Sequence, residues 1–263
     1  MIITQVLHTI QGEGKYLGYP SILIRVGNCN LSCPYCDTKW SSDINQINKI
    51  NNHDDMKNFV SDIIDKYLNK LPYPNIMITG GEPLLYIEDL YSFAQLLNKY
   101  VSHPDQLFFD IETNGTLLSY ENIQKLIDIR KYINLNLNIS PKFDIDAHSS
   151  NVTSVNQIME RYGDIEKRLK KFNNKVIPYC YKFIHGAFDE SYITRFVDNY
   201  HINKSKVYCM SFTPIHIEDD EEFYKQFWLN NLRTADFCRS FGFIYSFRQH
   251  IYLFGRGSAE FND

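Results

Sequence analysis

The sequence lacks any long apolar run, and its charge is nearly balanced. Its 263 residues carry 27 Lys and Arg against 31 Asp and Glu, a formal net charge of −4 at pH 7. No apolar segment reaches the about 20 residues of a membrane-spanning helix, so no membrane partner is expected. Without a basic excess there is no electrostatic argument for a nucleic-acid partner. The first residues also lack a basic segment followed by an apolar one, which predicts a cytoplasmic protein without a secretory signal.

Cysteine is scarce as well, with six residues in the chain. In the reducing cytoplasm such cysteines indicate a metal site or catalysis rather than disulfides. Cys180, Cys209 and Cys238 are far apart and lie on predicted strands or a helix. Ligands of a second cluster are one interpretation of these three, but without a close pair we expect buried core thiols.

The other three cysteines lie within eight residues. Cys29, Cys33 and Cys36 are spaced C-x3-C-x2-C. A structural zinc site normally has four ligands, usually as two close pairs, and no second pair follows here. Three thiolates can hold a 4Fe–4S cluster and leave one iron open to a small molecule. The alternative is a zinc knuckle that borrows a fourth ligand such as His53 or Asp37, and the spacing favours the cluster.

Apolar runs alternate with segments of helical periodicity about six times along the chain. The predicted strands cover residues 21–26, 75–79, 107–111, 133–139, 179–184 and 206–212. The predicted helices cover residues 54–70, 87–102, 119–131, part of 153–172, 188–200 and 219–240. A final extended run is predicted over residues 243–253. This rhythm predicts a single α/β domain with a mostly parallel sheet and right-handed crossovers.

Polar or glycine-rich clusters follow four of these strands. They are the cysteine loop, Gly80-Gly81-Glu82, Glu112-Thr113-Asn114-Gly115 and Ser140-Pro141-Lys142. Each cluster alone is typical of a turn. Functional groups of parallel sheets collect at the carboxyl ends of the strands, so we expect the four clusters to meet on one face.

Such a face suits a ligand with an amine, a carboxylate and a ribose. Glu82 offers an acceptor for an ammonium, and Glu112 and Asn114 offer partners for ribose hydroxyls. Ser140 and Lys142 can meet a carboxylate or the edge of the sugar.

The cysteine spacing, together with Gly80-Gly81-Glu82-Pro83, resembles the motifs of the radical S-adenosylmethionine (SAM) enzymes. More narrowly, the chain resembles the 7-carboxy-7-deazaguanine synthase family. The matching residues are Gln11-Gly12-Glu13-Gly14, Cys36-Asp37-Thr38, Thr79-Gly80-Gly81-Glu82-Pro83, Glu112-Thr113-Asn114-Gly115-Thr116, Ser140-Pro141-Lys142 and His250. They run across nearly the whole chain.

The resemblance implies a partial (β/α)6 radical SAM barrel with mostly parallel strands. It implies one domain over residues 1–263, with an N-terminal extension (1–20) and a C-terminal segment that caps the substrate (243–263). The implied enzyme is a lyase that contracts the ring of 6-carboxy-5,6,7,8-tetrahydropterin to 7-carboxy-7-deazaguanine with loss of ammonia, in queuosine and other deazapurine biosynthesis. In the implied reaction, a radical generated from SAM would remove the hydrogen at C6, and SAM would be regenerated.

The resemblance also implies a role for each matching residue. The cluster would be held by the catalytic residues Cys29, Cys33 and Cys36. SAM would be bound by Gly80, Gly81, Glu82, Glu112, Asn114, Ser140 and Lys142. The substrate would be bound by Gln11, Gly12, Glu13, Gly14, Arg25, Thr79 and His250, and Mg2+ by Thr38. A flavodoxin-like or other electron donor and a homodimer are implied as well.

Two features depart from the family pattern. Pro34-Tyr35 stands where the family often has Trp, and Phe247-Arg248-Gln249-His250 replaces Pro-Arg-Leu-His. These departures concern the far edge of the substrate. Two alternatives stay open on other grounds. One is another radical SAM enzyme such as a glycyl-radical activase, which has no need of residues 11–14 or Thr38. The other is a zinc-binding interaction domain without catalysis.

Overall fold

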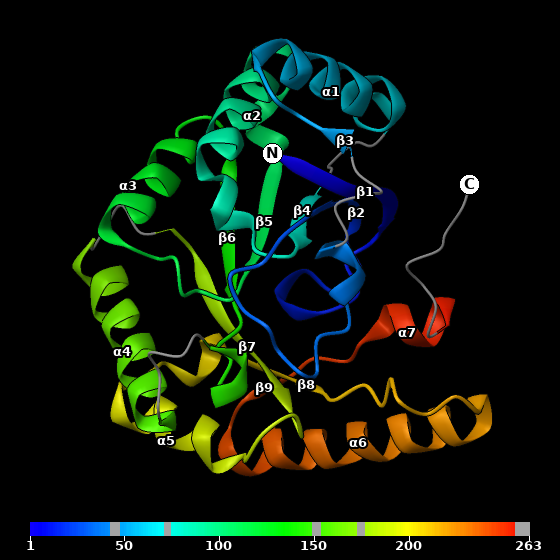
Figure 1. The fold of residues 1–263 in the computed structure, drawn as a ribbon, viewed down its shortest axis with the longest axis vertical. Coiled ribbons are helices and arrows are strands. Elements are labelled where there is room, and N and C mark those ends of the chain that lie inside the picture. The colour runs from blue at the N-terminus through cyan, green and yellow to red at the C-terminus, as the bar shows by residue number, and fades with distance from the viewer. Residues whose placement is uncertain (43–47, 71–74, 149–153, 173–176, 256–263) are drawn as a thin grey trace.

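The sheet is the centre of the molecule (Figure 1). The computed structural model describes residues 1–42, 48–70, 75–148, 154–172 and 177–255. Within these ranges nine strands form one sheet in the order β3-β1-β2-β4-β5-β6-β7-β8-β9. Its strands are β1 Ile2–Ile10, β2 Pro20–Val26, β3 Asn48–Lys49, β4 Asn75–Gly80, β5 Phe108–Thr113, β6 Asn134–Ile139, β7 Tyr179–His185, β8 Val207–Ser211 and β9 Ile244–Tyr245.

Helices follow six of the strands along the chain. They are α1 His53–Lys66, α2 Ile87–Tyr100, α3 Tyr120–Ile129, α4 Val155–Lys171, α5 Ser191–Asn199 and α6 Asp220–Phe241, with the short α7 Gln249–Phe254 near the C-terminus. From β2 to β9 every neighbouring pair is parallel. The predicted α/β partial barrel with mostly parallel strands is therefore confirmed. In the described part of the chain, no helix is both long and apolar enough to cross a membrane.

Two predicted boundaries were wrong. The first helix ends at Lys66 rather than residue 70, and a separate 3-10 turn follows it at Leu68–Lys70. The final extended run contains only the two-residue β9, because the chain then turns into α7. The Gln249 N–H at the start of α7 donates to the Gly12 carbonyl (2.9 Å), so a contact with a distant loop overrides the local preference.

The two faces of the sheet differ in chemistry. Ile78, Ile111 and Leu137 belong to the face that packs against the helices, and all three are fully buried. Side chains alternate along a strand, and register partners in parallel strands share a face. The opposite, inner face therefore carries polar groups, as in the register pairs Arg25–Thr79, Glu112–Asn138 and Asn138–Cys180.

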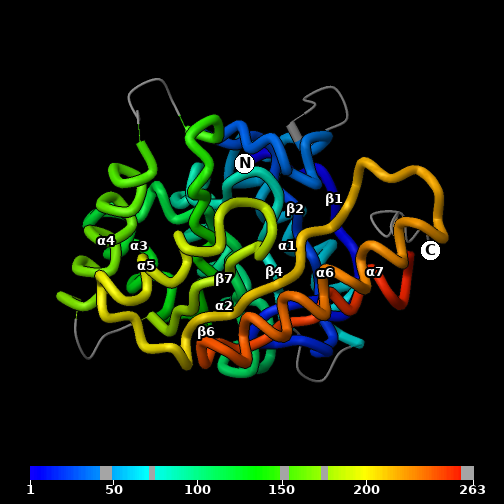
Figure 2. Tube along the Cα trace, turned by 90° about the horizontal axis from the view of Figure 1, so that it is seen from below, coloured from blue at the N-terminus to red at the C-terminus, as the bar shows by residue number. Residues whose placement is uncertain are grey.

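The loop after β1 meets the C-terminal segment at residues 246–249. The predicted N-terminal extension contributes β1, which pairs antiparallel with β2. The loop that follows β1 contacts the C-terminal segment, because the Gly14 N–H donates to Ser246 Oγ at 2.7 Å. Figure 2 shows the red C-terminal segment with α7 beside the blue N-terminal strands, as Figure 1 does. This contact places residues 11–14 over the inner face.

Candidate active site

The cysteine loop follows β2 and lies against the loop that follows β4. The Glu82 N–H donates to the Asn28 carbonyl at 2.8 Å, and the Gly81 N–H donates to the Val26 carbonyl at 2.9 Å. A Cβ on Gly81 would lie 1.6 Å from the Asn28 oxygen. Glycine is therefore required at this position, because any side chain would push the two loops apart.

The donor set of the cysteine loop fits an iron–sulfur cluster. Cys29, Cys33 and Cys36 are free thiols, of which Cys29 is exposed and the other two are half-buried. Partial burial raises the pKa of Cys33 to about 11, so this thiol keeps its proton at neutral pH until a metal displaces it. In the described ranges no group of three His, Cys, Asp and Glu side chains is placed to hold a metal ion. Three thiols on one loop are nonetheless the donors that iron–sulfur clusters use.

Asp37 and His53 are the two candidates for a fourth zinc ligand. The Asp37 carboxylate forms an ion pair with the Arg248 guanidinium at 2.8 Å. His53 is exposed at the first residue of α1.

Glu82 joins the ends of β4 and β5. Its carboxylate is fully buried and accepts from Thr113 Oγ1 (2.6 Å), the Asn114 N–H (2.7 Å) and the Leu84 N–H (3.0 Å). Burial raises the pKa of Glu82, and the bonds from Thr113, Asn114 and Leu84 oppose that effect. Because a carboxylate has about four acceptor positions, these three donors leave one for an incoming ammonium.

Asn114 connects the β5 loop to the cysteine loop. Its Nδ2 donates to Asn30 Oδ1 at 2.9 Å and lies 3.9 Å from Cys29 Sγ. The β6 loop joins the same group, because the Ser140 N–H donates to the Thr113 carbonyl at 2.8 Å. The structure therefore brings together all four clusters that follow strands in the sequence.

The Tyr162 hydroxyl on α4 holds two of these loops together. It donates to the Asn114 carbonyl at 2.9 Å and accepts from the Lys142 N–H at 3.1 Å. The side chain is fully buried. Lys142 Nζ in turn donates to Ser140 Oγ at 2.8 Å. Tyr162 thus positions the segment in which SAM-binding residues are predicted.

Tyr162→Phe is expected to lower the free energy of unfolding by about 1–3 kcal/mol, because two buried backbone groups lose their partner. Weaker SAM binding should accompany this loss. Chemical denaturation and equilibrium SAM binding measure the two effects. Tyr100→Phe, at a half-exposed position of α2, is the control and should change stability by less than about 0.5 kcal/mol. Equal stability of the two variants would contradict the assigned bridge.

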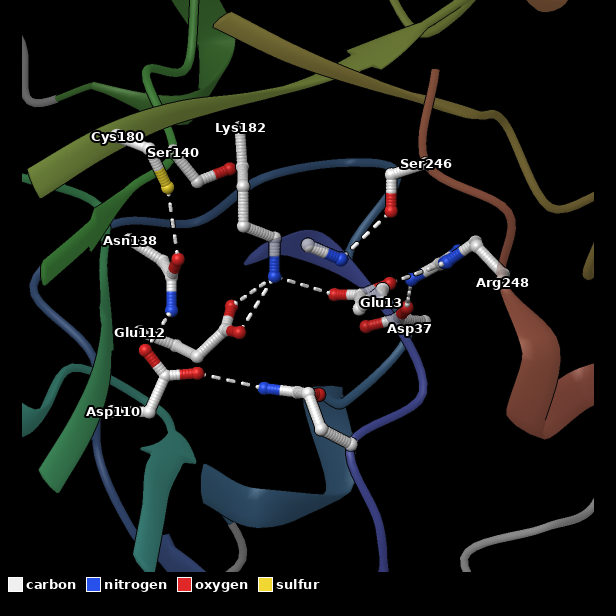
Figure 3. Close-up of polar contacts among 12 residues, drawn as sticks. Glu13, Asp37, Asp110, Glu112, Asn138, Ser140, Cys180, Lys182, Ser246 and Arg248 are labelled. Atoms are coloured by element: carbon white, nitrogen blue, oxygen red, sulfur yellow. Dashed lines mark hydrogen bonds and ion pairs between the residues drawn. The ribbon is translucent and has the colours of Figure 1, made fainter. Parts of the chain in front are cut away.

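Acidic and basic side chains alternate across the inner face (Figure 3). Lys182 on β7 is 1% exposed, and its Nζ contacts Glu13 Oε1 at 2.8 Å and Glu112 Oε1 at 2.6 Å. Burial opposes ionisation of Glu13, but Lys182 and Arg248 outweigh it and hold its pKa well below the usual range. Burial raises the pKa of Glu112 to about 7, despite the opposing charge of Lys182. Glu112 therefore gains a proton before Glu13 on acidification.

Arg248 connects three loops. Its Nε donates to Glu13 at 3.0 Å, its Nη2 donates to Asp37 at 2.8 Å, and its Nη1 donates to Thr213 after β8. Asp37 precedes Thr38, the predicted Mg2+ ligand, whose Oγ1 lies 3.6 Å from Cys36 Sγ. Arg248 thus fixes the end of the cysteine loop relative to residues 11–14.

The remaining predicted substrate residues lie at the same side of the barrel. Gln11 is buried and donates from Nε2 to Asp110 at 2.9 Å. A Cβ on Gly12 would lie 2.1 Å from His250 Nδ1, so only glycine lets the imidazole approach this loop. Arg25 lies beside Thr79 in the β2–β4 register, and its guanidinium carbon is 5.4 Å from the Trp40 ring centroid. Arg25 is therefore an inner-face residue rather than a surface charge.

Comparison with known proteins gives the family. Residues 23–196 match the Radical SAM superfamily. The 7-carboxy-7-deazaguanine synthase of Methanocaldococcus jannaschii is 30% identical over 193 residues, which cover 62% of this chain and 79% of that protein. The chain belongs to the 7-carboxy-7-deazaguanine synthase family. Its relative of the same name in Pyrobaculum aerophilum is 24% identical over 262 residues and aligns with 98% of this chain and 96% of its own length.

Solved structures confirm the fold of this synthase-family chain. The crystal structure of QueE from Escherichia coli superposes with a TM-score of 0.55 at 19% identity, covering 95% of this chain and 94% of that one. Native anSMEcpe with bound AdoMet gives a TM-score of 0.57 at 18% identity, covering 86% of this chain and 64% of that one. Both identities are low, so these structures support the radical SAM fold and nothing finer.

Several site residues of this synthase-family chain were not predicted from its sequence. Lys182 is the single charge of the predicted strand 179–184 and Asp110 that of the predicted strand 107–111, which is the signal that could have identified them. Arg248 was noted as part of a variant motif but not as the link between three loops. The predicted core thiols are confirmed, because Cys180, Cys209 and Cys238 are all buried.

Proposed function

We propose that the protein is a 7-carboxy-7-deazaguanine synthase, a carbon–nitrogen lyase that converts 6-carboxy-5,6,7,8-tetrahydropterin to 7-carboxy-7-deazaguanine and ammonia. The observation that carries the proposal is the contact between the cysteine loop and residues 11–14 through Asp37, Arg248 and Glu13. It joins the radical-generating loop to the loop that carries the most specific family motif. The named relatives support the same reaction rather than that of a glycyl-radical activase.

Cys29, Cys33 and Cys36 would hold a 4Fe–4S cluster, which with bound SAM supplies the radical that starts the reaction. The remaining acceptor position of Glu82 would take the SAM ammonium. Glycine at positions 80 and 81 would let the backbone approach the methionine part of SAM.

Four further residues would complete the SAM site. Asn114 would hold the ribose, and Ser140 and Lys142 would meet the carboxylate or the sugar edge. Glu112 would serve as a further ribose acceptor. Lys182 Nζ, which donates to Glu112 Oε1 at 2.6 Å, would position it.

Residues from both ends of the chain would bind the substrate. Gln11 and Glu13 would accept hydrogen bonds from ring N–H groups, and Arg25 would pair with the carboxylate. Thr79 and His250 would line the same site, and the His250 Nδ1 atom is buried without a partner among the described residues. Enclosure of the substrate by these residues would keep water from reactive species.

Other parts of the proposal rest on family membership. Thr38 would bind a Mg2+ ion that shares the substrate carboxylate. Residues 1–263 would form one domain in which segment 243–263 caps the substrate, although residues 256–263 lie outside the described ranges. A flavodoxin-like or other electron donor, a homodimer, a cytoplasmic location and a role in queuosine biosynthesis complete the proposal.

An anaerobic assay of the reconstituted protein tests this function. The mixture contains dithionite, SAM, Mg2+ and 6-carboxytetrahydropterin, and mass spectrometry detects the product. We expect 7-carboxy-7-deazaguanine without matching consumption of SAM, and none from the Cys33→Ala control. A brown protein that forms 5′-deoxyadenosine but no pterin product would contradict the substrate. A colourless protein that binds zinc would contradict the radical chemistry as well.

A further inference from the structure

Asp110 is a buried carboxylate that no part of the proposed reaction uses. It lies on the inner face of β5, two residues before Glu112, and is 1% exposed. Three side-chain amides donate to it: Gln11 Nε2 to Oδ2 at 2.9 Å, and Asn136 Nδ2 and Asn138 Nδ2 to Oδ1 at 2.8 and 2.6 Å. Figure 3 shows Asp110 below both Glu112 and Asn138.

The hydrogen bonds around Asp110 define which end of each amide faces it. An ionised carboxylate only accepts, so every amide that contacts it must turn its NH2 group inward. Cys180 Sγ donates to Asn138 Oδ1 at 3.0 Å, which independently directs the Asn138 NH2 group toward Asp110. The Gln11 amide obeys the same rule.

The backbone around Gln11 is already fixed. Its N–H donates to the Tyr19 carbonyl at 2.7 Å, and its carbonyl accepts from the Gly18 N–H at 2.8 Å. Because the backbone is held, the orientation of the Gln11 side-chain amide decides whether a donor or an acceptor faces a ligand. Asp110 takes the Nε2 end, so the amide has its carbonyl oxygen, Oε1, to present to a ligand.

We propose that Asp110 is a positioning residue that makes Gln11 a hydrogen-bond acceptor toward the substrate, so that the site selects a heterocycle edge carrying N–H donors. This inference rests on the proposed function and explains why the substrate site presents hydrogen-bond acceptors. The neighbouring Glu13 is also an acceptor. Together they favour a reduced pterin, with its ring N–H and amino groups, over a heterocycle whose matching edge carries acceptors.

A reciprocal exchange of amide and carboxylate tests the proposal. In Asp110→Asn, the new NH2 group faces Gln11, whose amide then rotates and turns its own NH2 group toward the substrate. In Gln11→Glu, two carboxylates face each other. In the double variant, the amide introduced at position 110 still accepts from Asn136 and Asn138. It also donates to the carboxylate at position 11, which again presents an acceptor.

The readouts are thermal unfolding and the substrate dissociation constant, measured without reductant so that no turnover occurs. Asp110→Asn should keep its thermal midpoint but bind 6-carboxytetrahydropterin at least about tenfold more weakly, since a buried polar group of the substrate meets the wrong partner. Gln11→Glu should lower the thermal midpoint by at least about 4 °C. The double variant should return to within about threefold of wild-type affinity and recover the midpoint.

Three outcomes would overturn the inference. Unchanged affinity in Asp110→Asn, with wild type binding the pterin, removes the positioning role while the proposed function stands. If Asp110 has only a structural role, Asp110→Asn should lose thermal midpoint and substrate affinity together, and the double variant should not restore either. If wild-type protein binds no pterin and forms no product, the proposed function fails and the inference falls with it.

Discussion

Replacing Lys182 by Met is expected to lower the free energy of unfolding by about 3–5 kcal/mol and to abolish product formation. The ammonium is 1% exposed and lies between Glu13 and Glu112 at 2.8 and 2.6 Å. Removing the buried ammonium leaves two carboxylates, only 16% and 15% exposed, without their common partner. Chemical denaturation of the unreconstituted chain measures the first effect, and the anaerobic assay measures the second.

Two variants make this prediction specific. Lys125→Met removes an ammonium 2.8 Å from Glu88 in an exposed pair, and should cost less than about 1 kcal/mol. Lys182→Met combined with Glu112→Gln should recover part of the lost stability, because Glu13 keeps Arg248 as a partner. Equal costs for the Lys125 and Lys182 substitutions would show that burial of Lys182 does not govern the effect.

Between pH 4.5 and 7, wild-type protein is expected to lose stability relative to Glu112→Gln as the pH rises. Burial raises the pKa of Glu112 in the folded state to about 7, from an ordinary value of 4.5. The folded state therefore binds more protons than the unfolded state in this window, so the free energy of unfolding falls with increasing pH. The full change is at most about 3.5 kcal/mol, because the pKa rises from 4.5 to about 7 and one pKa unit corresponds to about 1.4 kcal/mol.

Urea denaturation of both proteins at half-unit steps of pH measures this difference. Groups that titrate equally in the two proteins cancel in the comparison. The lowered pKa of Glu13 acts in the opposite direction, because that stabilisation is lost below pH 4.5 as the carboxylate becomes protonated. A stability difference that is flat from pH 4.5 to 7, or that rises, would contradict the raised pKa of Glu112.

The strand–helix order and the convergence of the four loops could be predicted because they depend on local patterns. Apolar runs such as residues 75–79 define buried strands, and the carboxyl ends of parallel strands lie at one side. The sequence of β6 also alternates Asn and Leu, and the structure shows that the two residue types lie on opposite faces of the sheet. Asn136 and Asn138 face the interior of the barrel and Leu135 and Leu137 face the helices.

The partners of the buried charges could not be predicted in the same way. Lys182 meets Glu13 across 169 positions of sequence, and Arg248 meets Glu13 across 235. No local pattern encodes such pairs, because the backbone path of the whole barrel decides them. The short α7 was missed for a related reason, since its first N–H is held by Gly12 rather than by local helix preference.

The contact between the two ends of the chain also sets an order of events during synthesis. Residues 12–14 leave the ribosome long before their partners Ser246, Arg248 and Gln249, which lie up to 237 positions later. At 5–20 residues per second, this gap lasts roughly 10–50 s. Throughout that interval the three thiols of the cysteine loop are unobstructed by the C-terminal segment. The cysteine loop is therefore accessible on the nascent chain before Arg248 contacts Asp37, whereas the contacts of residues 12–14 with the C-terminal segment form last.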